Sequence, residues 1–188
     1  MSGANLPSQK EAIAAALALY AARPFAVADI GSQSAWLKGA SHHARNLYVS
    51  GPMGLASSVA LGVAACRPDE QVLAICGDGA LAMNLSSLVT IQGARTANLT
   101  VLLLDNGIYE YTGSLPVPTR DLDWLALGRA TFGAESCFRL EELTAEKWKG
   151  VKRPAMIVAV IAPSTEETPK LGMTPSQIRE AFREASRN

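Results

Sequence analysis

Short aliphatic runs alternate with segments of helical character along most of the chain. The runs cover residues 25–30, 47–49, 72–76, 99–104 and 156–161, and the first four are each followed by a glycine or a polar residue. They are mostly apolar and show no alternation of apolar and polar residues, which is typical of strands that are covered on both faces of a parallel sheet. The pattern predicts an α/β fold of three layers, with a mostly parallel twisted sheet between helices on both faces.

Seven segments around these runs are predicted to be helices: residues 7–22, 33–40, 55–65, 83–96, 122–131, 145–149 and 175–185. The first has a capping pattern, because Ser8 precedes Glu11 by three positions. No linker or low-complexity segment divides the chain. We therefore expect one domain over residues 1–188, with residues 1–24 as an N-terminal helical extension.

Composition excludes several classes of protein. With 48% hydrophobic and 18% charged residues, the chain can bury a core and is not a disordered protein. Seventeen basic residues balance seventeen acidic ones, so no excess positive charge is available to bind nucleic acid. The cysteines Cys66, Cys76 and Cys137 are odd in number and lack CxxC spacing, which argues against a disulfide scaffold, a zinc ribbon or an iron–sulfur cluster. This usage favours a reducing compartment.

The chain also lacks the features of a membrane or secreted protein. Its most apolar stretches, residues 12–22 and 155–163, are shorter than the roughly 20 residues that span a bilayer. The first residues do not form a basic segment followed by an apolar one, as a signal peptide would. We expect a cytoplasmic protein without a membrane partner.

Candidate chemistry follows the strands, because open parallel sheets bind ligands beyond the carboxyl ends of their strands. The loops at that edge would be residues 31–34, 50–54, 77–80 and 105–113. In Gly77-Asp78-Gly79, the glycines let the backbone approach a ligand, and free N–H groups at a helix start suit a phosphate. Asp78 would repel that phosphate unless a divalent cation lay between them, and oxygen ligands of this kind suit magnesium.

A second polar motif follows the next strand. Asp105-Asn106-Gly107 would place the amide oxygen of Asn106 at the same sheet edge. Either motif alone is more often a turn than a metal site. Together, at the ends of two aliphatic strands and with residues 80–104 between them, they are much more specific.

Gly77-Asp78-Gly79 followed by Asp105-Asn106 resembles the cofactor motif of the thiamine diphosphate-dependent enzymes, in which the second part is two asparagines. Asp105 replaces the first asparagine. The resemblance covers roughly residues 25–187: Gly51-Pro52-Met53-Gly54 is similar to the segment that holds the aminopyrimidine, and residues 122–133 and 153–163 to the closing elements of the domain. The chain is most similar overall to the diphosphate-binding half of sulfopyruvate and phosphonopyruvate decarboxylases, which is a separate β subunit in sulfopyruvate members.

The resemblance implies specific roles. Magnesium would be bound by the side chains of Asp78 and Asn106 and by the backbone carbonyl of Ile108. The implied cofactor-binding set is Ser32, Gly51, Met53, Gly77, Asp78, Gly79, Ala80, Asn106, Ile108 and Tyr109. In it, the N–H groups of Gly79 and Ala80 would hold the diphosphate, although many relatives have serine instead of Ala80. Met53 would brace the V-shaped cofactor and the Gly51 carbonyl would accept a hydrogen bond from the 4′-amino group, so these two are expected to act in catalysis.

Two expected features are missing from the sequence. Thiamine enzymes of this kind need a glutamate on a pyrimidine-binding domain, and one domain already fills this chain. The resemblance therefore implies a hetero-oligomer with a pyrimidine-binding α-type subunit. The related decarboxylases also have a Gly-Gly-Gln-type segment soon after the metal loop, whereas residues 109–116 here contain none.

The leading hypothesis is the diphosphate-binding subunit of a thiamine diphosphate-dependent 2-oxoacid decarboxylase. An acetolactate synthase-type carboligase subunit and a non-catalytic cofactor-binding or regulatory module remain alternatives. A 2-oxoacid:ferredoxin oxidoreductase β subunit is disfavoured because its cluster cysteines are missing, and a Rossmann nucleotide binder because no GxGxxG follows the first strand. His42 and His43 are predicted to be an exposed pair, with the alternative that they face the substrate as acid, base or anion holder, and the role of Glu110 is open.

Overall fold

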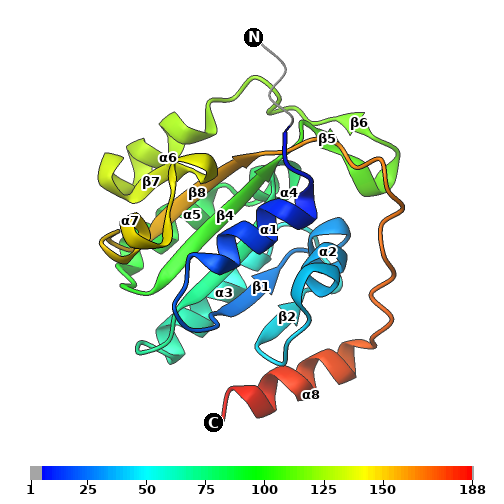
Figure 1. Cartoon of the computed structure of the whole chain (residues 1–188), viewed down its shortest axis with the longest axis horizontal. Coiled ribbons are helices and arrows are strands. Elements are labelled where there is room, and N and C mark those ends of the chain that lie inside the picture. Colours follow the sequence, from blue (N-terminus) through cyan, green and yellow to red (C-terminus); the bar gives the residue numbers. More distant parts are fainter. Residues whose placement is uncertain (1–5, 188) are drawn as a thin grey trace.

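A six-stranded parallel sheet forms the centre of the protein (Figure 1). The computed structural model describes residues 6–187. The strand order is β2-β1-β3-β4-β8-β7, and every pair of neighbours is parallel. These strands are β1 (Phe25–Ala28), β2 (Asn46–Tyr48), β3 (Val72–Gly77), β4 (Leu99–Asp105), β7 (Cys137–Arg139) and β8 (Ala155–Val160). The predicted parallel sheet is confirmed.

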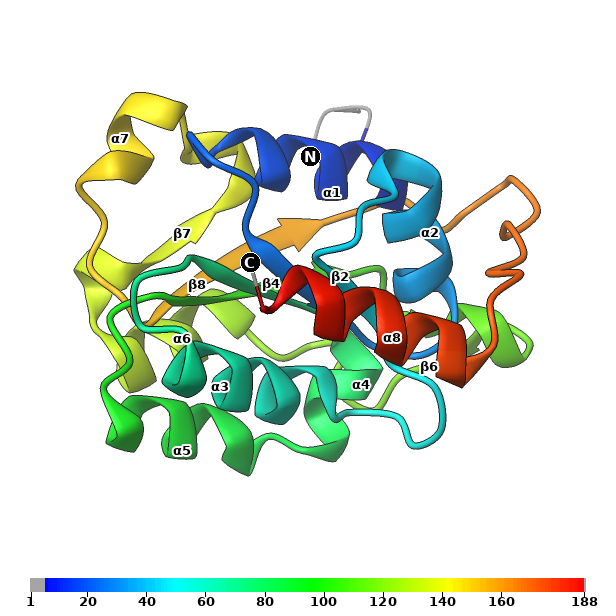
Figure 2. The same cartoon turned by 90° about the horizontal axis from the view of Figure 1, so that it is seen from below.

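Helices cover both faces of this sheet (Figure 2). One face carries α1 (Gln9–Ala18), α2 (Ser32–Ser41) and α7 (Ala145–Lys149), and the other carries α3 (Ala56–Cys66), α4 (Asp78–Met83), α5 (Ser86–Ala94) and α6 (Trp124–Phe132). The last helix, α8 (Pro175–Ala185), packs along the edge strand β2. Three 3₁₀ helices complete the described elements: η1 (Glu110–Thr112), η2 (Ala134–Ser136) and η3 (Leu140–Glu142). The predicted three layers are confirmed.

The central strands explain why the apolar runs did not alternate. Along β3, Leu73 and Ile75 join the core beneath α1 and α2, whereas Val72, Ala74 and Cys76 join the core on the opposite face. Successive side chains of a strand point to opposite faces, so a strand covered on both sides must be apolar at every position. The sheet therefore separates two hydrophobic cores.

The helix predicted over residues 83–96 is present but shorter, as α5, which begins at Ser86. A separate helix that was not predicted, α4, precedes it and begins directly at Asp78. Between them, the Asn84 side chain donates to the carbonyl of Gly54 and to the hydroxyl of Ser58, both at 3.0 Å. Asparagine side chains that bond to backbone groups compete with helix formation, which accounts for the break.

Three short strands were not predicted. One is β7, and the other two form a hairpin of β5 (Ile108–Tyr109) and β6 (Leu115–Pro116). Two or three residues are too few for the period of a strand to be recognised. At the N-terminus, α1 is shorter than predicted, but Ser8 and Glu11 form the expected capping box. Within residues 6–187 no helix combines the length and apolarity needed to cross a membrane.

Candidate functional site

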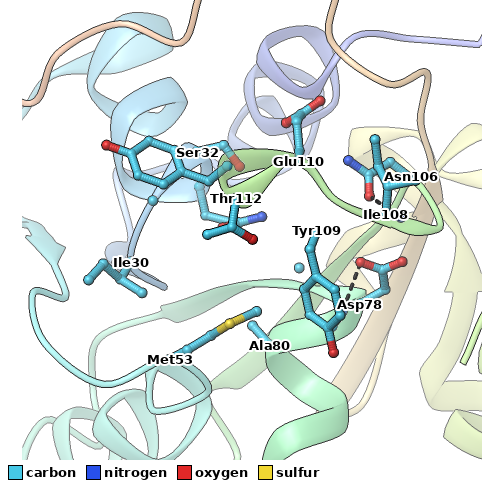
Figure 3. A pocket seen from close by; sticks show the side chains of 15 residues that line it. Ile30, Ser32, Met53, Asp78, Ala80, Asn106, Ile108, Tyr109, Glu110 and Thr112 are labelled. Atoms are coloured by element: carbon cyan, nitrogen blue, oxygen red, sulfur yellow. Dashed lines mark hydrogen bonds between the residues drawn. The ribbon is translucent and has the colours of Figure 1, made fainter. Parts of the chain in front are cut away.

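Strand register brings the predicted loops to one edge of the sheet. Ala28 lies level with Ile75, and Gly77 lies level with Leu104, so β1, β3 and β4 end side by side. A cavity of about 280 Å³ lies beyond these ends (Figure 3). Its walls contain most of the predicted set, namely Ser32, Met53, Gly77, Asp78, Gly79, Ala80, Asn106, Ile108 and Tyr109. Gly51 alone of that set does not line the cavity.

The Asp78 carboxylate joins the two sequence motifs. Asp78 is the first residue of α4 and is 3% exposed. One carboxylate oxygen accepts a hydrogen bond from the N–H of Gly79 at 2.8 Å, and the other accepts from the N–H of Gly107 at 2.9 Å. The loop after β4 is therefore fixed against the start of α4 by this side chain.

The electrostatics of this edge favour a cation. The pKa of Asp78 is raised to about 6, chiefly by burial and also by the neighbouring Asp105 carboxylate, while the N–H groups of Gly79 and Gly107 oppose the rise. Burial also raises the pKa of Asp105. Two poorly solvated carboxylates repel each other, and a divalent ion beside them would offset that repulsion.

The oxygen atoms around the cavity fit magnesium better than a softer metal. Asp78, Asn106 and Ile108 line the same cavity and offer a carboxylate, an amide and a backbone carbonyl (Figure 3). Hard oxygen ligands of few carboxylates, completed by phosphate oxygens, are what Mg²⁺ prefers. In the part of the chain that the structure describes, no group of three His, Cys, Asp or Glu residues could hold a metal. The fit thus depends on this mixed set of ligands.

Protein neighbours crowd the glycines of the motif. A Cβ atom on Gly79 would lie 2.4 Å from a ring carbon of Tyr109 and 3.0 Å from a methyl of Val117. A Cβ on Gly77 would lie 2.6 Å from the side-chain nitrogen of Gln33. Tyr109 therefore packs against α4 and holds the loop after β4 in place. Glycine is therefore favoured at position 79 even before any ligand is considered, whereas the end of the flexible Gln33 side chain could move aside for a Cβ at position 77.

We expect Gly79→Ala to destabilise the chain, because the added methyl group must displace the Tyr109 ring. Overpacking of this kind costs about 1–3 kcal/mol, which urea unfolding would measure. Gly62→Ala in α3 is the matched control, since a Cβ there meets no atom within 4 Å. It should instead stabilise by up to about 1 kcal/mol, the helix propensity difference. Equal stability of wild type and Gly79→Ala would show that Tyr109 moves freely.

The aminopyrimidine-type segment lies on the other side of the cavity. Met53 is half-buried and its side chain extends into the cavity, below Thr112 and beside Ala80 in Figure 3. Gly51 is exposed, with φ +119° and no atom within 4 Å of the position of a Cβ. The positive φ of Gly51 favours glycine, whereas no described residue lies close enough to exclude a larger side chain there.

The cavity wall also contains six residues outside the predicted cofactor-binding set, namely Ile30, Gly31, Gln33, Glu110, Tyr111 and Thr112. All but Ile30 lie in the loops, residues 31–34 and 105–113, that were predicted at this edge of the sheet. Tyr111 covers Gly31, with a ring carbon 3.5 Å from the position of a Cβ. Glu110 accepts a hydrogen bond from the N–H of Ser164 at 2.5 Å. The residues of η1 have no periodic pattern that could have placed them over the cavity. His42 and His43 are exposed, as predicted, and do not line it.

Comparisons with known proteins agree with this geometry. Residues 29–135 match the family model described as thiamine pyrophosphate enzyme, C-terminal TPP binding domain. The sulfopyruvate decarboxylase subunit beta of Methanococcus maripaludis is 32% identical over 88% of this chain and 91% of the relative. The phosphonopyruvate decarboxylase of Streptomyces viridochromogenes is 30% identical over 84% of this chain but only 41% of the relative.

A solved structure supports the fold. The X-ray structure of a putative thiamin diphosphate-dependent enzyme from Mycobacterium smegmatis superposes with a TM-score of 0.67 and 20% identity. The match covers 84% of this chain and 32% of that one, so this chain spans about a third of its length. The family match covers more than half of the 188 residues and includes both polar motifs. The chain belongs to the thiamine pyrophosphate enzyme family and contains its C-terminal TPP-binding domain.

Proposed function

We propose that this chain is the diphosphate- and magnesium-binding subunit of a heteromeric thiamine diphosphate-dependent 2-oxoacid decarboxylase. The observation that carries the proposal is one cavity that combines Asp78, Asn106 and Ile108 with the glycine-rich start of α4. The relatives named sulfopyruvate and phosphonopyruvate decarboxylase, at 32% and 30% identity, suggest a substrate of similar chemistry. Such a substrate is a small 2-oxo acid with a second anionic group.

The residues of the chain would hold the cofactor at two places. Asp78, Asn106 and Ile108 would bind Mg²⁺, and the N–H groups of Gly79 and Ala80 would donate to the diphosphate. The N–H of Gly79 already donates to Asp78, so it would share its hydrogen. Gly77, Ser32 and Tyr109 complete this wall. When bound, the thiazolium ring supplies the electron sink for decarboxylation.

Met53 would act on the shape of the cofactor. Its half-buried side chain enters the cavity opposite the metal-binding groups (Figure 3). A bulky apolar side chain there would keep the aminopyrimidine folded towards the thiazolium ring, and the Gly51 carbonyl would accept from the 4′-amino group. These two residues would thereby orient the reacting groups without touching the metal.

We expect Met53→Ala to lower kcat of the assembled enzyme by about 10²-fold, the size of effect that a misplacement of about 1 Å can produce. Metal affinity should stay unchanged, because Met53 contributes no oxygen ligand. Steady-state kinetics and a Mg²⁺ titration would separate the two effects. Met53→Leu, which keeps the apolar bulk, is the control and should retain most of the activity. Parallel loss of turnover and metal affinity would assign Met53 to packing alone.

A second subunit would complete the site. Met83, Tyr111 and Leu115 are large apolar side chains that are 64–69% exposed. Met83 lies beside Gly54, and Tyr111 lines the cavity itself. Exposed apolar groups at a site are suited to burial by a partner. The phosphonopyruvate decarboxylase relative has more than half of its length outside the match, whereas the β subunit is matched almost end to end. We propose a pyrimidine-binding α-type subunit as the partner.

The domain assignment and location belong to the same proposal. The proposed single domain covers residues 1–188 with residues 1–24 as its extension, and residues 1–5 lie outside the described part. Helix α1 supports this assignment, because Ala12, Ile13 and Ala16 are buried in the core on one face of the sheet. The free thiols of Cys66, Cys76 and Cys137 agree with a reducing compartment, for which we propose the cytoplasm.

The assembled complex tests the function. Loaded with thiamine diphosphate and Mg²⁺, it should release carbon dioxide from at least one of a panel of 2-oxo acids that includes sulfopyruvate and phosphonopyruvate. A carbon–carbon condensation product instead would support the carboligase alternative. Cofactor binding without any turnover would support a non-catalytic module. Absence of cofactor binding would contradict the proposal as a whole.

A further inference from the structure

Asp29 is a fully buried carboxylate beside the cavity that does not line it. It directly follows β1, and one of its oxygens accepts three backbone hydrogen bonds, from Gly54, Leu55 and Ala56, at 3.0, 3.1 and 3.2 Å. Leu55 is the N-cap of α3 and makes no capping hydrogen bond with its own side chain. Asp29, at the end of β1, therefore caps the N-terminus of α3. A negative charge is favoured at that position by the helix dipole.

Gly54 is held from its other side as well. Its carbonyl accepts a hydrogen bond from the Asn84 side chain at 3.0 Å. Its φ is +86°, and a Cβ there would lie 2.7 Å from the carbonyl oxygen of Ala80. Gly54 is thus fixed between Asp29 at the end of β1 and helix α4, which carries the proposed diphosphate-binding groups. No other residue type could sit at this position without moving one of the two.

The anchor at Gly54 determines where the preceding residues can lie. Met53 is one residue away and half-buried, whereas Gly51 is exposed and has no atom within 4 Å of the position of a Cβ. The chain from Gly51 to Met53 therefore depends on its attachment at Gly54. Loss of the Asp29 carboxylate would free three N–H groups at once and release that attachment.

We infer that Asp29 is a positioning residue: through the N–H groups of residues 54–56 it fixes Met53 and Gly51 against the organic part of the cofactor. The inference rests on the proposed function. The hydrogen bonds that the Asp29 carboxylate accepts come neither from the diphosphate-binding backbone nor from the metal-binding residues. Its removal should therefore affect the contacts to the aminopyrimidine and thiazolium rings and spare those to the diphosphate and the metal.

The opposite end of α3 offers a matched control. Asn98 is 3% exposed, and its side chain donates to the carbonyls of Ala64, Arg67 and Glu70 at 3.1, 2.8 and 2.8 Å. Asp29 and Asn98 are thus buried polar anchors at the two ends of one helix. Asn98 does not line the cavity. A purely structural role of Asp29 would make the two substitutions equivalent.

The experiment compares two probes on the full chain by isothermal titration: thiamine diphosphate with Mg²⁺, and inorganic pyrophosphate with Mg²⁺. Asp29→Ala should weaken binding of the first about tenfold or more, the size expected when hydrogen bonds to a charged group are lost. Binding of pyrophosphate should change by less than about twofold, as for a distant surface substitution. Asn98→Ala should lower Tm and leave both affinities unchanged.

Asp29→Asn keeps the volume and one acceptor oxygen, so it should show a smaller loss of thiamine diphosphate affinity in the same direction. If Asp29→Ala does not fold, the titrations of Asp29→Asn test the inference instead. Hydrogen exchange should accelerate at the amides of residues 54–56 in both Asp29 variants but not in Asn98→Ala. Parallel weakening of both probes, or a thiamine diphosphate affinity equal to that of Asn98→Ala, would overturn the inference. Failure of the wild type to bind either probe would instead contradict the proposed function.

Discussion

Asp78→Ala is expected to abolish magnesium-dependent binding of thiamine diphosphate. Its carboxylate is almost fully buried at the point where a diphosphate would meet the start of α4. A carboxylate beside a diphosphate is repulsive without a metal, so the same side chain that would oppose the free cofactor would recruit its magnesium complex. Substitution of residues around metal ligands costs about 10–100-fold in affinity, and loss of a ligand itself should exceed that range.

Asp78→Ala should also disturb the structure of the site itself. Asp78 accepts hydrogen bonds from Gly79 and Gly107, so alanine leaves both N–H groups without this acceptor. Asn106 and Ile108 are the residues on either side of Gly107 in this loop. The substitution would therefore remove one of the three oxygen atoms proposed to bind magnesium, and it would also release the loop that positions the other two.

Isothermal titration of thiamine diphosphate in magnesium and in excess chelator measures the effect. Asp123→Ala is a suitable control, because Asp123 is also an aspartate at a helix start, where it accepts a hydrogen bond from Ala126 at 2.9 Å. It is exposed and does not line the cavity. Undiminished affinity in chelator, or in Asp78→Ala with magnesium present, would count against the site.

The sequence was sufficient to predict the parts of the site that depend on patterns extending over many residues, namely the apolar strands and the family motif. The runs that became β3 and β4 are apolar at every position except Thr100 because two cores cover them, and their ends necessarily place Asp78 and Asn106 at one edge. The match of the glycine motif to its family then identified most of the cavity wall. Both inferences depend on patterns of many residues, which tolerate local irregularity.

Features formed by single tertiary contacts could not be predicted in this way. The break between α4 and α5 depends on the Asn84 side chain reaching Gly54, which is distant in sequence. Tyr111 lies over Gly31 through a hairpin whose strands have two residues each. The burial of Asp29 under the start of α3 likewise has no periodic signal, because its carboxylate is held by the N–H groups of residues that are 25 to 27 positions away.

The chain on its own is expected to show no decarboxylase activity, even when saturated with thiamine diphosphate and magnesium. The resemblance to the family implies that ylid formation requires a glutamate near the aminopyrimidine. The acidic side chains that line the cavity within the described residues are Asp78 and Glu110. Asp78 is engaged by two backbone N–H groups, and Glu110 is engaged by that of Ser164. Figure 3 places both carboxylates across the cavity from Met53, where the aminopyrimidine would lie.

Activity should therefore appear only when the proposed pyrimidine-binding subunit supplies that acid. The measurement is carbon dioxide release from a panel of 2-oxo acids, first by the lone chain and then after the second subunit is added, with a gain of at least about 10²-fold, typical of a positioned acid or base. Complex assembled with Asp78→Ala is the negative control. The exposed Met83, Tyr111 and Leu115 should also make the lone chain self-associate, which the partner would suppress. Turnover at an enzymatic rate by the chain alone would show that a residue of its own activates the cofactor, and the two-subunit proposal would then be wrong.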